Sequence, residues 1–293
     1  MSEHAVEVSH PDRVVFPGIG LTKGELVAYY VRVADWILPH LRGRPLTMQI
    51  FPKGVGAPGS TYIKERRKHF PDWVGSAAVP TSDATKKKRG DELIMPVIDS
   101  ADALAYIANQ GMVTPHVWLS RADDPSHPDR LVFDLDPSTT DLGIVRDTAL
   151  ELRTVLSADG LEPFVKSTGS RGLHVTVPLD RSADIGAVRA YAEAVASDLA
   201  VAHPDTLTTE FSKAARGTRL FLDVMRNGRS QTEVAAYGVR GLPTAPVAVP
   251  LEWSEVRSFE PGRWTVANVF RRLSRRDDPW AELDASARPL PSH

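Results

Sequence analysis

A short apolar, β-prone run leads directly into two aspartates that are separated by one residue. The run is Leu131-Val-Phe133, and the acids are Asp134 and Asp136. Successive side chains of a strand point to opposite faces, so both carboxylates leave the strand on the same side. Carboxylate oxygens are the ligands that hard divalent cations prefer. The sequence therefore predicts a buried strand that ends in a cation site.

A third acid in a similar setting favours this interpretation over a simple turn, in which aspartates are also common. Asp223 follows another apolar strand, Leu220-Phe-Leu222. Two cations roughly 4 Å apart, held by such carboxylates, clamp the attacking and leaving oxygens in phosphoryl and nucleotidyl transfer. We expect Asp134, Asp136 and Asp223 to hold two divalent ions in a metal-dependent nucleotidyltransferase.

The overall composition limits the chemistry and the partners. The chain has 293 residues, and its 35 Lys and Arg nearly cancel its 37 Asp and Glu, so any contact with nucleic acid must be local. There is no cysteine, which excludes disulfides, thiolate metal sites and thiol nucleophiles. No apolar stretch approaches the roughly 20 residues of a membrane span, and no leader is recognisable. We expect a cytoplasmic, nucleoid-associated protein with no membrane partner.

The N-terminal region predicts a helix whose first turn suits an anion. Thr22 and Glu25 form a capping-box pattern before an apolar series at helical spacing, and this helix is expected to end within residues 39–43. Arg13 and Lys23 flank the loop that leads into it. Unpaired amides and the helix dipole favour negative charge at such a place, so we expect an anion site there.

A glycine-rich turn, Ser167-Thr-Gly-Ser-Arg-Gly172, is predicted between strands at 163–166 and 173–177. Its glycines allow backbone amides to approach a ligand. Together with its hydroxyls, its guanidinium and the following His174, they suit a triphosphate. A hairpin turn with an incidental basic residue is the alternative. Further candidate phosphate donors are Arg216, Arg219 and Arg240.

The remaining pattern indicates a mixed α/β protein in one domain over residues 1–293, with a frayed tail at about 285–293. Helices are expected over residues 100–109, 141–158, 185–202 and 264–273, and strands over parts of 45–63 and over 93–98 and 219–223. Residues 234–240 are expected to form a further strand or a loop. Basic runs at 64–69 and 85–90 are either solvated loops or local contacts to nucleic acid.

Four motifs in a fixed order carry a family resemblance. They are Phe133-Asp-Leu-Asp-Pro137, Thr168-Gly-Ser-Arg-Gly-Leu-His174, Phe221-Leu-Asp223 and Tyr237-Gly-Val-Arg240. Together they resemble the polymerase domain of bacterial ligase D, a primase-polymerase of the archaeo-eukaryotic primase superfamily, over almost the whole chain. The resemblance implies an archaeo-eukaryotic primase-like fold, in which a mixed α+β sheet forms an RRM-like catalytic core.

The same resemblance implies an activity and its partners. Such enzymes add nucleotides, as NTP or dNTP, to 3′ ends at gapped or broken DNA that carries a 5′-phosphate on the downstream strand. They prefer manganese, with magnesium possible, and favour ribonucleotides. Nothing in this chain resembles the Lys-x-Asp-Gly adenylation motif of a ligase, so a separate DNA ligase, together with Ku, is expected to complete end joining.

The resemblance also assigns roles residue by residue. The metal-binding and catalytic residues are Asp134, Asp136 and Asp223; the nucleotide-binding residues are Thr168, Ser170, Arg171, His174, His116 and Arg240; the residues for the downstream 5′-phosphate are Arg13 and Lys23; and the template contact is Tyr62. Arg216, a candidate phosphate donor near the acids, is added to the nucleotide-binding set. Four positions depart from the family pattern: Gln49 and Gln231 replace lysines, and Ala236 and Gly238 replace proline and serine. The lost positive charge is expected to weaken nucleotide binding or to alter the choice of sugar.

Three other functions remain open at this stage. The first is gap filling in excision repair with a different ligase. The second is a haloacid-dehalogenase-like phosphatase, although that family needs threonine or valine at Ser138 and a later acidic pair that this chain lacks. The third is a non-catalytic DNA-end bridging module, for which Gln49 and Gln231 are the supporting features.

Overall fold

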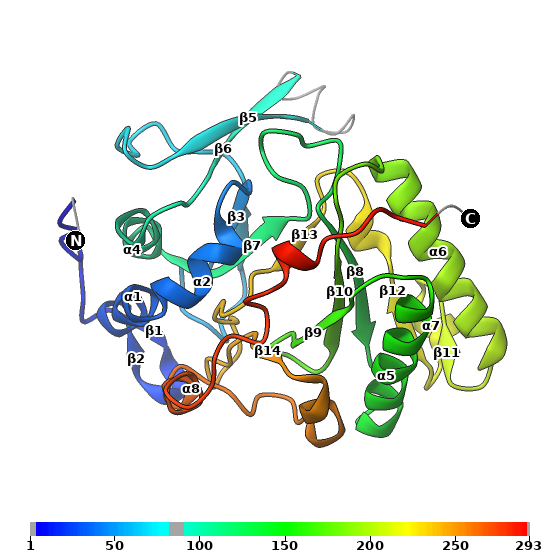
Figure 1. Cartoon of the computed structure of the whole chain (residues 1–293). Helices are drawn as coiled ribbons and strands as arrows, with labels where there is room; N and C mark the ends of the chain where they lie inside the picture. Colours follow the sequence, from blue (N-terminus) through cyan, green and yellow to red (C-terminus); the bar gives the residue numbers. More distant parts are fainter. Residues whose placement is uncertain (1–3, 82–90, 292–293) are drawn as a thin grey trace. The chain divides into compact units, whose positions relative to one another are not determined.

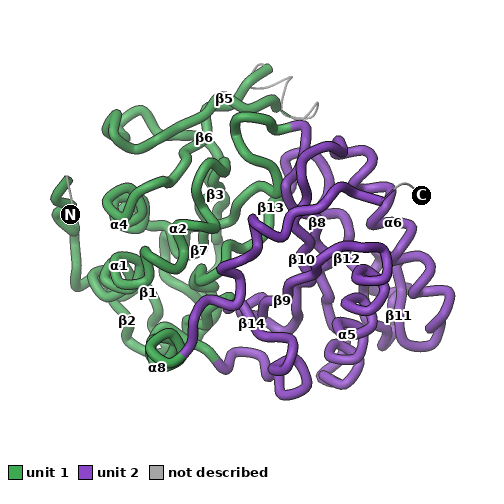
Figure 2. Tube along the Cα trace, viewed as in Figure 1, with its two compact units in different colours: residues 1–125, 232–248, 264–275 green, residues 126–231, 249–263, 276–293 purple. Residues whose placement is uncertain are grey.

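The chain divides into two compact units (Figures 1 and 2) in a computed structural model that describes residues 4–81 and 91–291. The first unit comprises residues 1–125, 232–248 and 264–275, and the second comprises 126–231, 249–263 and 276–293. Each unit is thus assembled from three separate segments, a division for which the sequence gives no local signal. The basic run at 85–90 lies outside the described residues.

The second unit is built on a six-stranded sheet with the strand order β11-β12-β8-β10-β9-β14. Its strands are β8 (Arg130–Asp136), β9 (Phe164–Ser167), β10 (Leu173–Pro178), β11 (Leu207–Thr208), β12 (Leu220–Asp223) and β14 (Pro250–Leu251). All neighbours are antiparallel except β11 and β12, which are parallel. Strand β8, which carries the paired aspartates, is therefore an interior strand.

Two long helices, α5 (Leu142–Ala158) and α6 (Ile185–Ala202), cover one face of this sheet (Figure 1). Leu131, Phe133 and Leu135 of β8 are fully buried in the core that these helices close. Because side chains alternate along a strand, Asp134 and Asp136 point to the opposite face. The apolar run thus both fixes the strand and directs the acids away from the core.

Part of the opposite face is closed by Trp280. Its indole is buried, donates from Nε1 to the Val165 carbonyl at 3.1 Å, and lies near the charged groups of Arg130 and Lys166. The segment expected to be a tail continues from here. Arg288 forms an isolated bridge with Leu179, and the segment keeps contact with the unit as far as it is described. The shorter elements of the second unit are α7 (Lys213–Arg216) and the 3-10 helices η2 (Met225–Asn227), η3 (Trp253–Ser258) and η4 (Asp284–Ser286).

The first unit contains a four-stranded antiparallel sheet with the order β13-β7-β3-β4. Its strands are β3 (Leu46–Ile50), β4 (Thr61–Ile63), β7 (Met112–Trp118) and β13 (Thr232–Val234). Outside this sheet, β1 (Val14–Phe16) pairs with β2 (Leu21–Thr22), and β5 (Ser76–Pro80) pairs with β6 (Glu92–Pro96). Its helices are η1 (Pro17–Ile19), α1 (Lys23–Arg32), α2 (Ala34–Leu41), α4 (Ala101–Asn109) and α8 (Val269–Leu273).

The capping box predicted at the first helix is confirmed, but the prediction of one continuous helix is wrong. Thr22 Oγ1 accepts from the Glu25 amide at 3.2 Å, and the Glu25 carboxylate accepts from the Thr22 amide at 2.8 Å. The helix breaks at Val33, which ends α1 and precedes α2. Val33 is fully buried, as are Tyr30 on α1 and Ile37 on α2, so the break allows both short helices to face the core.

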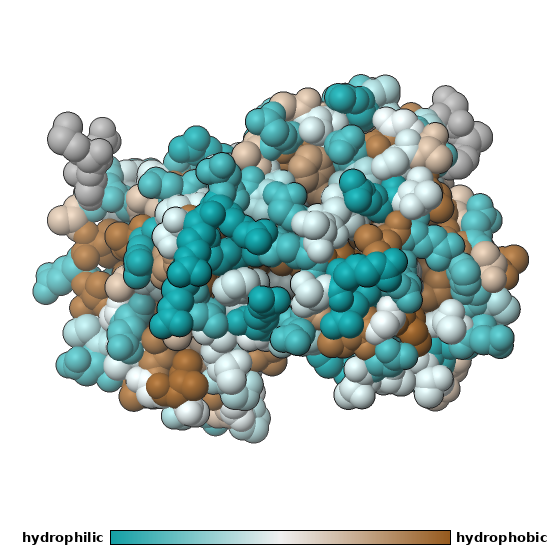
Figure 3. Space-filling view, turned by 60° about the horizontal axis from the view of Figure 1, so that its bottom comes forward, coloured by the Kyte–Doolittle hydropathy of each residue, from teal (hydrophilic) through white to brown (hydrophobic). Residues whose placement is uncertain are grey.

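The helix expected over 264–273 is confined to Val269–Leu273. Of the region 234–240, expected as a strand or a loop, only Val234 belongs to a strand, at the end of β13. In the view of Figure 3, hydrophilic side chains cover most of the surface and hydrophobic ones form separate patches. Among residues 4–81 and 91–291, no helix has the length and apolarity to cross a bilayer.

Candidate active site

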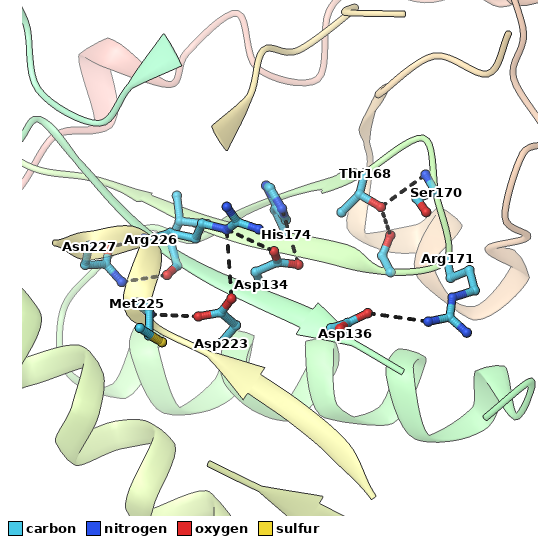
Figure 4. Close-up of polar contacts among 12 residues, drawn as sticks. Asp134, Asp136, Thr168, Ser170, Arg171, His174, Asp223, Met225, Arg226 and Asn227 are labelled. Atoms are coloured by element: carbon cyan, nitrogen blue, oxygen red, sulfur yellow. Dashed lines mark hydrogen bonds and ion pairs between the residues drawn. The ribbon is translucent and has the colours of Figure 1, made fainter. Parts of the chain in front are cut away.

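Strand pairing brings the three predicted acids to one face of the second unit's sheet. Asp223 of β12 lies opposite Asp134 of β8, and Asp136 stands two residues further along β8. His174 of β10 lies opposite Asp134 on its other side. Residues directly opposite in antiparallel strands have Cβ atoms only about 5 Å apart. The register therefore forms a row of acid, acid and imidazole across three strands (Figure 4).

Asp134 is the most enclosed of the three acids. Its side chain is 13% exposed, with His174 Nε2 3.4 Å from one carboxylate oxygen and Arg226 Nε 3.3 Å from the other. Burial on its own raises the pKa of Asp134, but His174 and Arg226 outweigh it and lower the pKa to about 2. The carboxylate is therefore fully charged at neutral pH.

Asp223 is in a different electrostatic position. Burial raises its pKa, the bond from the Met225 amide to Oδ1 at 2.8 Å opposes that shift, and the negative charge of Asp134 raises the pKa further. Arg226 Nε lies 3.9 Å from Asp223 Oδ2 and so faces both carboxylates. The two acids repel each other, and a guanidinium between them offsets the repulsion.

Asn227 fixes the turn that carries Arg226. Its Oδ1 accepts from the Val132 amide at 2.9 Å, while its Nδ2 donates to the carbonyls of Val132 at 2.8 Å and Val224 at 2.9 Å. The side chain is buried, so these bonds tie η2 to the backbone of β8 without competition from water. Asn227 thereby sets the position of Arg226 against the acids (Figure 4).

Asp136 is more open and is held by two arginines. Its side chain is 46% exposed, with Arg216 Nη1 at 3.4 Å and Arg171 Nη2 at 3.8 Å. Arg216 is buried and stacks on the ring of Phe221, with 3.7 Å from its Cζ to the ring centroid. Arg219 is turned elsewhere, because its side chain donates to main-chain carbonyls of α7. Of the two, only Arg216 is directed at the acids.

The glycine-rich turn lies directly beside the acidic strand. Thr168 closes it, since its amide and hydroxyl both donate to the Gly172 carbonyl at 3.1 Å, and its Oγ1 accepts from the Ser170 amide at 3.2 Å. A Cβ on Gly172 would stand 2.0 Å from the Leu135 carbonyl oxygen. Only glycine permits this approach, which brings the turn alongside the strand that carries the aspartates.

Three other predicted site residues belong to the first unit, and two of them are in contact. Tyr62 of β4 makes an edge contact with His116 of β7, with ring centroids 5.4 Å apart. His116 Nε2 lies 3.4 Å from Gln49 Oε1, and Gln49 is the register partner of Tyr62. One of the family departures therefore touches a predicted nucleotide-binding residue. Arg240, half-buried, bonds through its amide to the Pro246 carbonyl at 2.7 Å.

The predicted anion residues also lie together in the first unit. The Lys23 amide donates to the Arg13 carbonyl at 2.8 Å, and Lys23 Nζ donates to the carbonyl and hydroxyl of Ser9 at 2.7 and 2.8 Å. Burial lowers the pKa of Lys23, and the positive charge of Arg13 lowers it further. Two like charges held this close gain from an anion between them.

The donor set at the acids fits hard divalent cations. Three carboxylates on one face offer only oxygen ligands, and a cationic group, Arg226, already lies between Asp134 and Asp223. Within the described part of the chain, no three His, Asp or Glu side chains are arranged to hold a metal ion. The carboxylates of the three acids are turned toward guanidinium groups instead of toward one another, which explains why they do not form such a cluster.

Arg226 and Asn227 were not among the site residues predicted from the sequence. Both follow Asp223 within four residues, in a segment that reads as an ordinary polar turn. A cation three residues after a strand-end acid is a weak local signal. The role of Asn227 depends on Val132, 95 positions away, and no local pattern could reveal it.

Comparison with known proteins places the chain among polymerase domains of bacterial end-joining proteins. The family described as "LigD, primase-polymerase domain" matches residues 22–280. The chain is 33% identical over 295 residues to the multifunctional non-homologous end joining protein LigD of Mycobacterium bovis, and 32% identical over 282 residues to that of Pseudomonas aeruginosa. These matches cover 98% and 94% of the chain but only 38% and 32% of the two relatives.

A solved structure agrees over the whole fold. The polymerase domain from Mycobacterium tuberculosis ligase D in complex with DNA superimposes with a TM-score of 0.88 at 32% identity. The match covers 98% of this chain and 100% of that domain. The mixed α/β architecture expected from the sequence is confirmed.

Proposed function

Because the chain belongs to the LigD primase-polymerase domain family, we propose that it extends 3′ ends at gaps and breaks in DNA during non-homologous end joining. The row of Asp223, Asp134 and His174, with Asp136 beside it, is the observation that carries this proposal. The M. tuberculosis domain of the same fold was solved in complex with DNA, which supports DNA as the substrate here.

The chain's own residues supply charge and orientation for nucleotidyl transfer. Asp134, Asp136 and Asp223 would hold two divalent ions, which would supply Lewis acidity to the attacking 3′ hydroxyl and charge neutralisation to the pyrophosphate. Asp134 needs no deprotonation to bind a cation at neutral pH, because its pKa is about 2. His174 and the anchored turn at Asn227 hold that carboxylate in position.

Arg171 and Arg216 are the proposed partners of the triphosphate. Both guanidinium groups lie against Asp136, so the oxygens of a nucleotide can replace or share these contacts. The turn at Thr168, Ser170 and Gly172 adds backbone amides beside them. We assign His116 and Arg240 to the nucleotide site and Tyr62 to the template, on the family resemblance alone.

The proposed function includes a preferred metal ion and a preferred nucleotide sugar. We propose manganese as the preferred ion, with magnesium as a weaker substitute, and ribonucleotides as the preferred substrates. Gln49 bears on the sugar, because it contacts His116 with a neutral amide where the family often has lysine. A DNA ligase and Ku are the proposed partners in end joining, the pathway named for its relatives, of which the chain spans 38% in the M. bovis protein.

Primer extension on a gapped duplex tests these points together. The duplex carries a 5′-phosphate at the downstream side of the gap, and the reactions compare manganese with magnesium and ribonucleotides with deoxyribonucleotides. We expect template-directed addition that is fastest with manganese and ribonucleotides. The double variant Asp134→Ala/Asp136→Ala should add nothing. Retained function at DNA ends in that variant would indicate a bridging module, and release of phosphate from a simple monoester would indicate a phosphatase.

A further inference from the structure

An exposed aromatic side chain stands near the acids and has no part in the site described so far. Phe211 lies in the loop between β11 and α7 and is 69% exposed. Leaving most of a phenyl ring in water forgoes the stabilisation that its burial would give. Isolated exposed hydrophobic residues are common, so exposure alone assigns no role. Any role of Phe211 therefore depends on the residues that surround it.

The loop that carries Phe211 is tied to the acid site through Arg216. The Arg216 side chain donates to the Glu210 carbonyl through Nε and to the Phe211 carbonyl through Nη2, both at 2.9 Å. The same guanidinium reaches Asp136 at 3.4 Å through Nη1. One buried side chain thus fixes the backbone at Phe211 and contacts a proposed metal ligand.

The ring of Phe211 is also fixed by an aromatic contact. It meets the ring of Phe221 edge-on, with centroids 6.5 Å apart and planes at 76°. Phe221 is the register partner of Asp136, and its face carries the Arg216 guanidinium. Phe211 is therefore held at the edge of the sheet, next to the residues that surround Asp136, with much of its surface turned to solvent.

We propose that Phe211 is a stacking platform for a nucleobase of the DNA near the primer end, an inference that rests on the proposed polymerase function. Exposed aromatic rings among cationic side chains are the usual means of binding single-stranded or frayed nucleic acid. Lys213, which is exposed and lies two residues after Phe211, provides positive charge for the phosphates. The 3′ end must come to the carboxylates, so the bases closest to it lie within reach of this edge.

A purely structural role for Phe211 makes a different prediction. The ring also lines a small cavity of about 230 Å³ together with Phe221 and Met225. If filling this cavity were its only task, leucine would serve nearly as well as phenylalanine. Stacking requires a planar ring, so tryptophan or tyrosine should replace phenylalanine and leucine should not.

Four variants and one fluorescent probe separate these roles. The full chain is prepared as wild type and as Phe211→Ala, Phe211→Leu, Phe211→Trp and the control Val201→Ala, an exposed apolar residue on α6. Each protein is titrated with gapped DNA that carries 2-aminopurine at one of the last three primer positions, at the template bases opposite, or on the incoming nucleotide. Extension kinetics and melting temperature are measured for the same samples.

We expect wild type and Phe211→Trp to change the 2-aminopurine fluorescence at one primer or template position, with the alanine and leucine variants losing that change. In the alanine and leucine variants, the KM for DNA should rise about ten-fold, while the KM for the nucleotide and the melting temperature stay near the wild-type values. Val201→Ala should match wild type. Equal fluorescence and KM in all five proteins would overturn the inference, as would a response confined to the incoming nucleotide.

Failure of the inference can be told apart from failure of the proposed function. If the wild-type protein extends primers and the Phe211 variants behave identically, the function stands and the stacking role is refuted. If the wild-type protein does not extend any primer, the polymerase proposal fails. The fluorescence titration still reports whether Phe211 touches a base, because it requires no turnover.

Discussion

Asp223 and Asp134 lie directly opposite each other on antiparallel strands β12 and β8, with the guanidinium of Arg226 3.9 Å from one carboxylate and 3.3 Å from the other. Their pKa values move in opposite directions, up for Asp223 and down to about 2 for Asp134. Two negative charges are thus kept close at neutral pH by a single positive side chain.

Replacing Asp223 by asparagine should abolish extension without weakening the fold. The neutral side chain keeps an oxygen for the Met225 amide but removes one of two repelling charges, so the melting temperature should stay equal or rise. Primer extension should fall at least 100-fold. Asp147→Asn, at an exposed residue paired with Arg257, is the control and should extend normally. If Asp223→Asn extends primers at the wild-type rate, this acid does not belong to the site.

Asp134 should make the protein sensitive to acid. Its folded pKa lies below the ordinary value of 3.8, so its contribution to stability is present above about pH 4 and is lost as the pH falls toward 2. The difference of nearly two pKa units corresponds to about 2 kcal/mol. Urea unfolding at pH 7, 4 and 3 should show a smaller loss for Asp134→Asn than for wild type. Parallel loss in both proteins would contradict the assignment. Asp223 acts in the opposite sense, because a raised pKa lowers stability as the pH rises through it.

Arg226→Met should destabilise the protein by about 1 kcal/mol at pH 7, because the two carboxylates then face each other without a cation. Millimolar manganese should restore most of the lost melting temperature, since the ions take over the neutralising role. Arg229→Met, which changes an exposed arginine three residues before the start of β13 at Thr232, serves as the control. Thermal melts with and without manganese give the measurement. If manganese does not change the melting temperature of Arg226→Met, this would argue against a metal ion at these acids.

Gly172→Ala should damage both stability and activity. The new Cβ would stand 2.0 Å from the Leu135 carbonyl oxygen, so either the turn or β8 must move. The free energy of unfolding measured in urea should fall by more than about 2 kcal/mol. Primer extension should also slow, because Arg171 moves with the turn. Gly18→Ala is the matched control, because its Cβ meets only the Pro243 carbonyl oxygen, at 3.7 Å. Equal stability of the two variants would refute the close approach.

Lys23→Ala should remove the preference for a downstream 5′-phosphate. Wild type should bind the phosphorylated gap more tightly than the same gap with a 5′ hydroxyl, and the variant should bind both alike. Binding of the phosphorylated duplex should also depend less on salt in the variant. Fluorescence anisotropy at two salt concentrations measures the effect. A preference that survives in Lys23→Ala and Arg13→Ala would place the phosphate elsewhere.

Local patterns in the sequence were sufficient for the elements that carry the site. The apolar run at Leu131–Phe133 predicted a buried strand and the common face of Asp134 and Asp136, and the spacing of Thr22 and Glu25 predicted the start of α1. The helix expected from residue 100 also begins there, with Ser100 Oγ accepting from the Ala103 amide at 3.1 Å ahead of α4. These features depend on neighbours within a few residues, so the sequence contains all the information needed.

The features that the sequence did not reveal depend on distant partners. Asp223 meets Asp134 only through the register of β12 against β8, and Asn227 acts on Val132 across 95 positions. The contact of Gln49 with His116 needs the pairing of β3 with β7, a strand that the sequence analysis did not predict. The break at Val33 depends on burial from both sides, and a helical apolar pattern continues through it without interruption.

The origin of the second unit from three separate segments has a consequence for its synthesis on the ribosome. Strand β14 and Trp280, which complete the sheet and cover part of its acidic face, come from beyond residue 248. A nascent chain that has emerged only through β12 already carries all three acids but cannot finish the sheet that holds them. Contacts of such long range slow folding and leave partly folded chains exposed to aggregation. Chaperone demand during translation should therefore last until the final segment has left the exit tunnel.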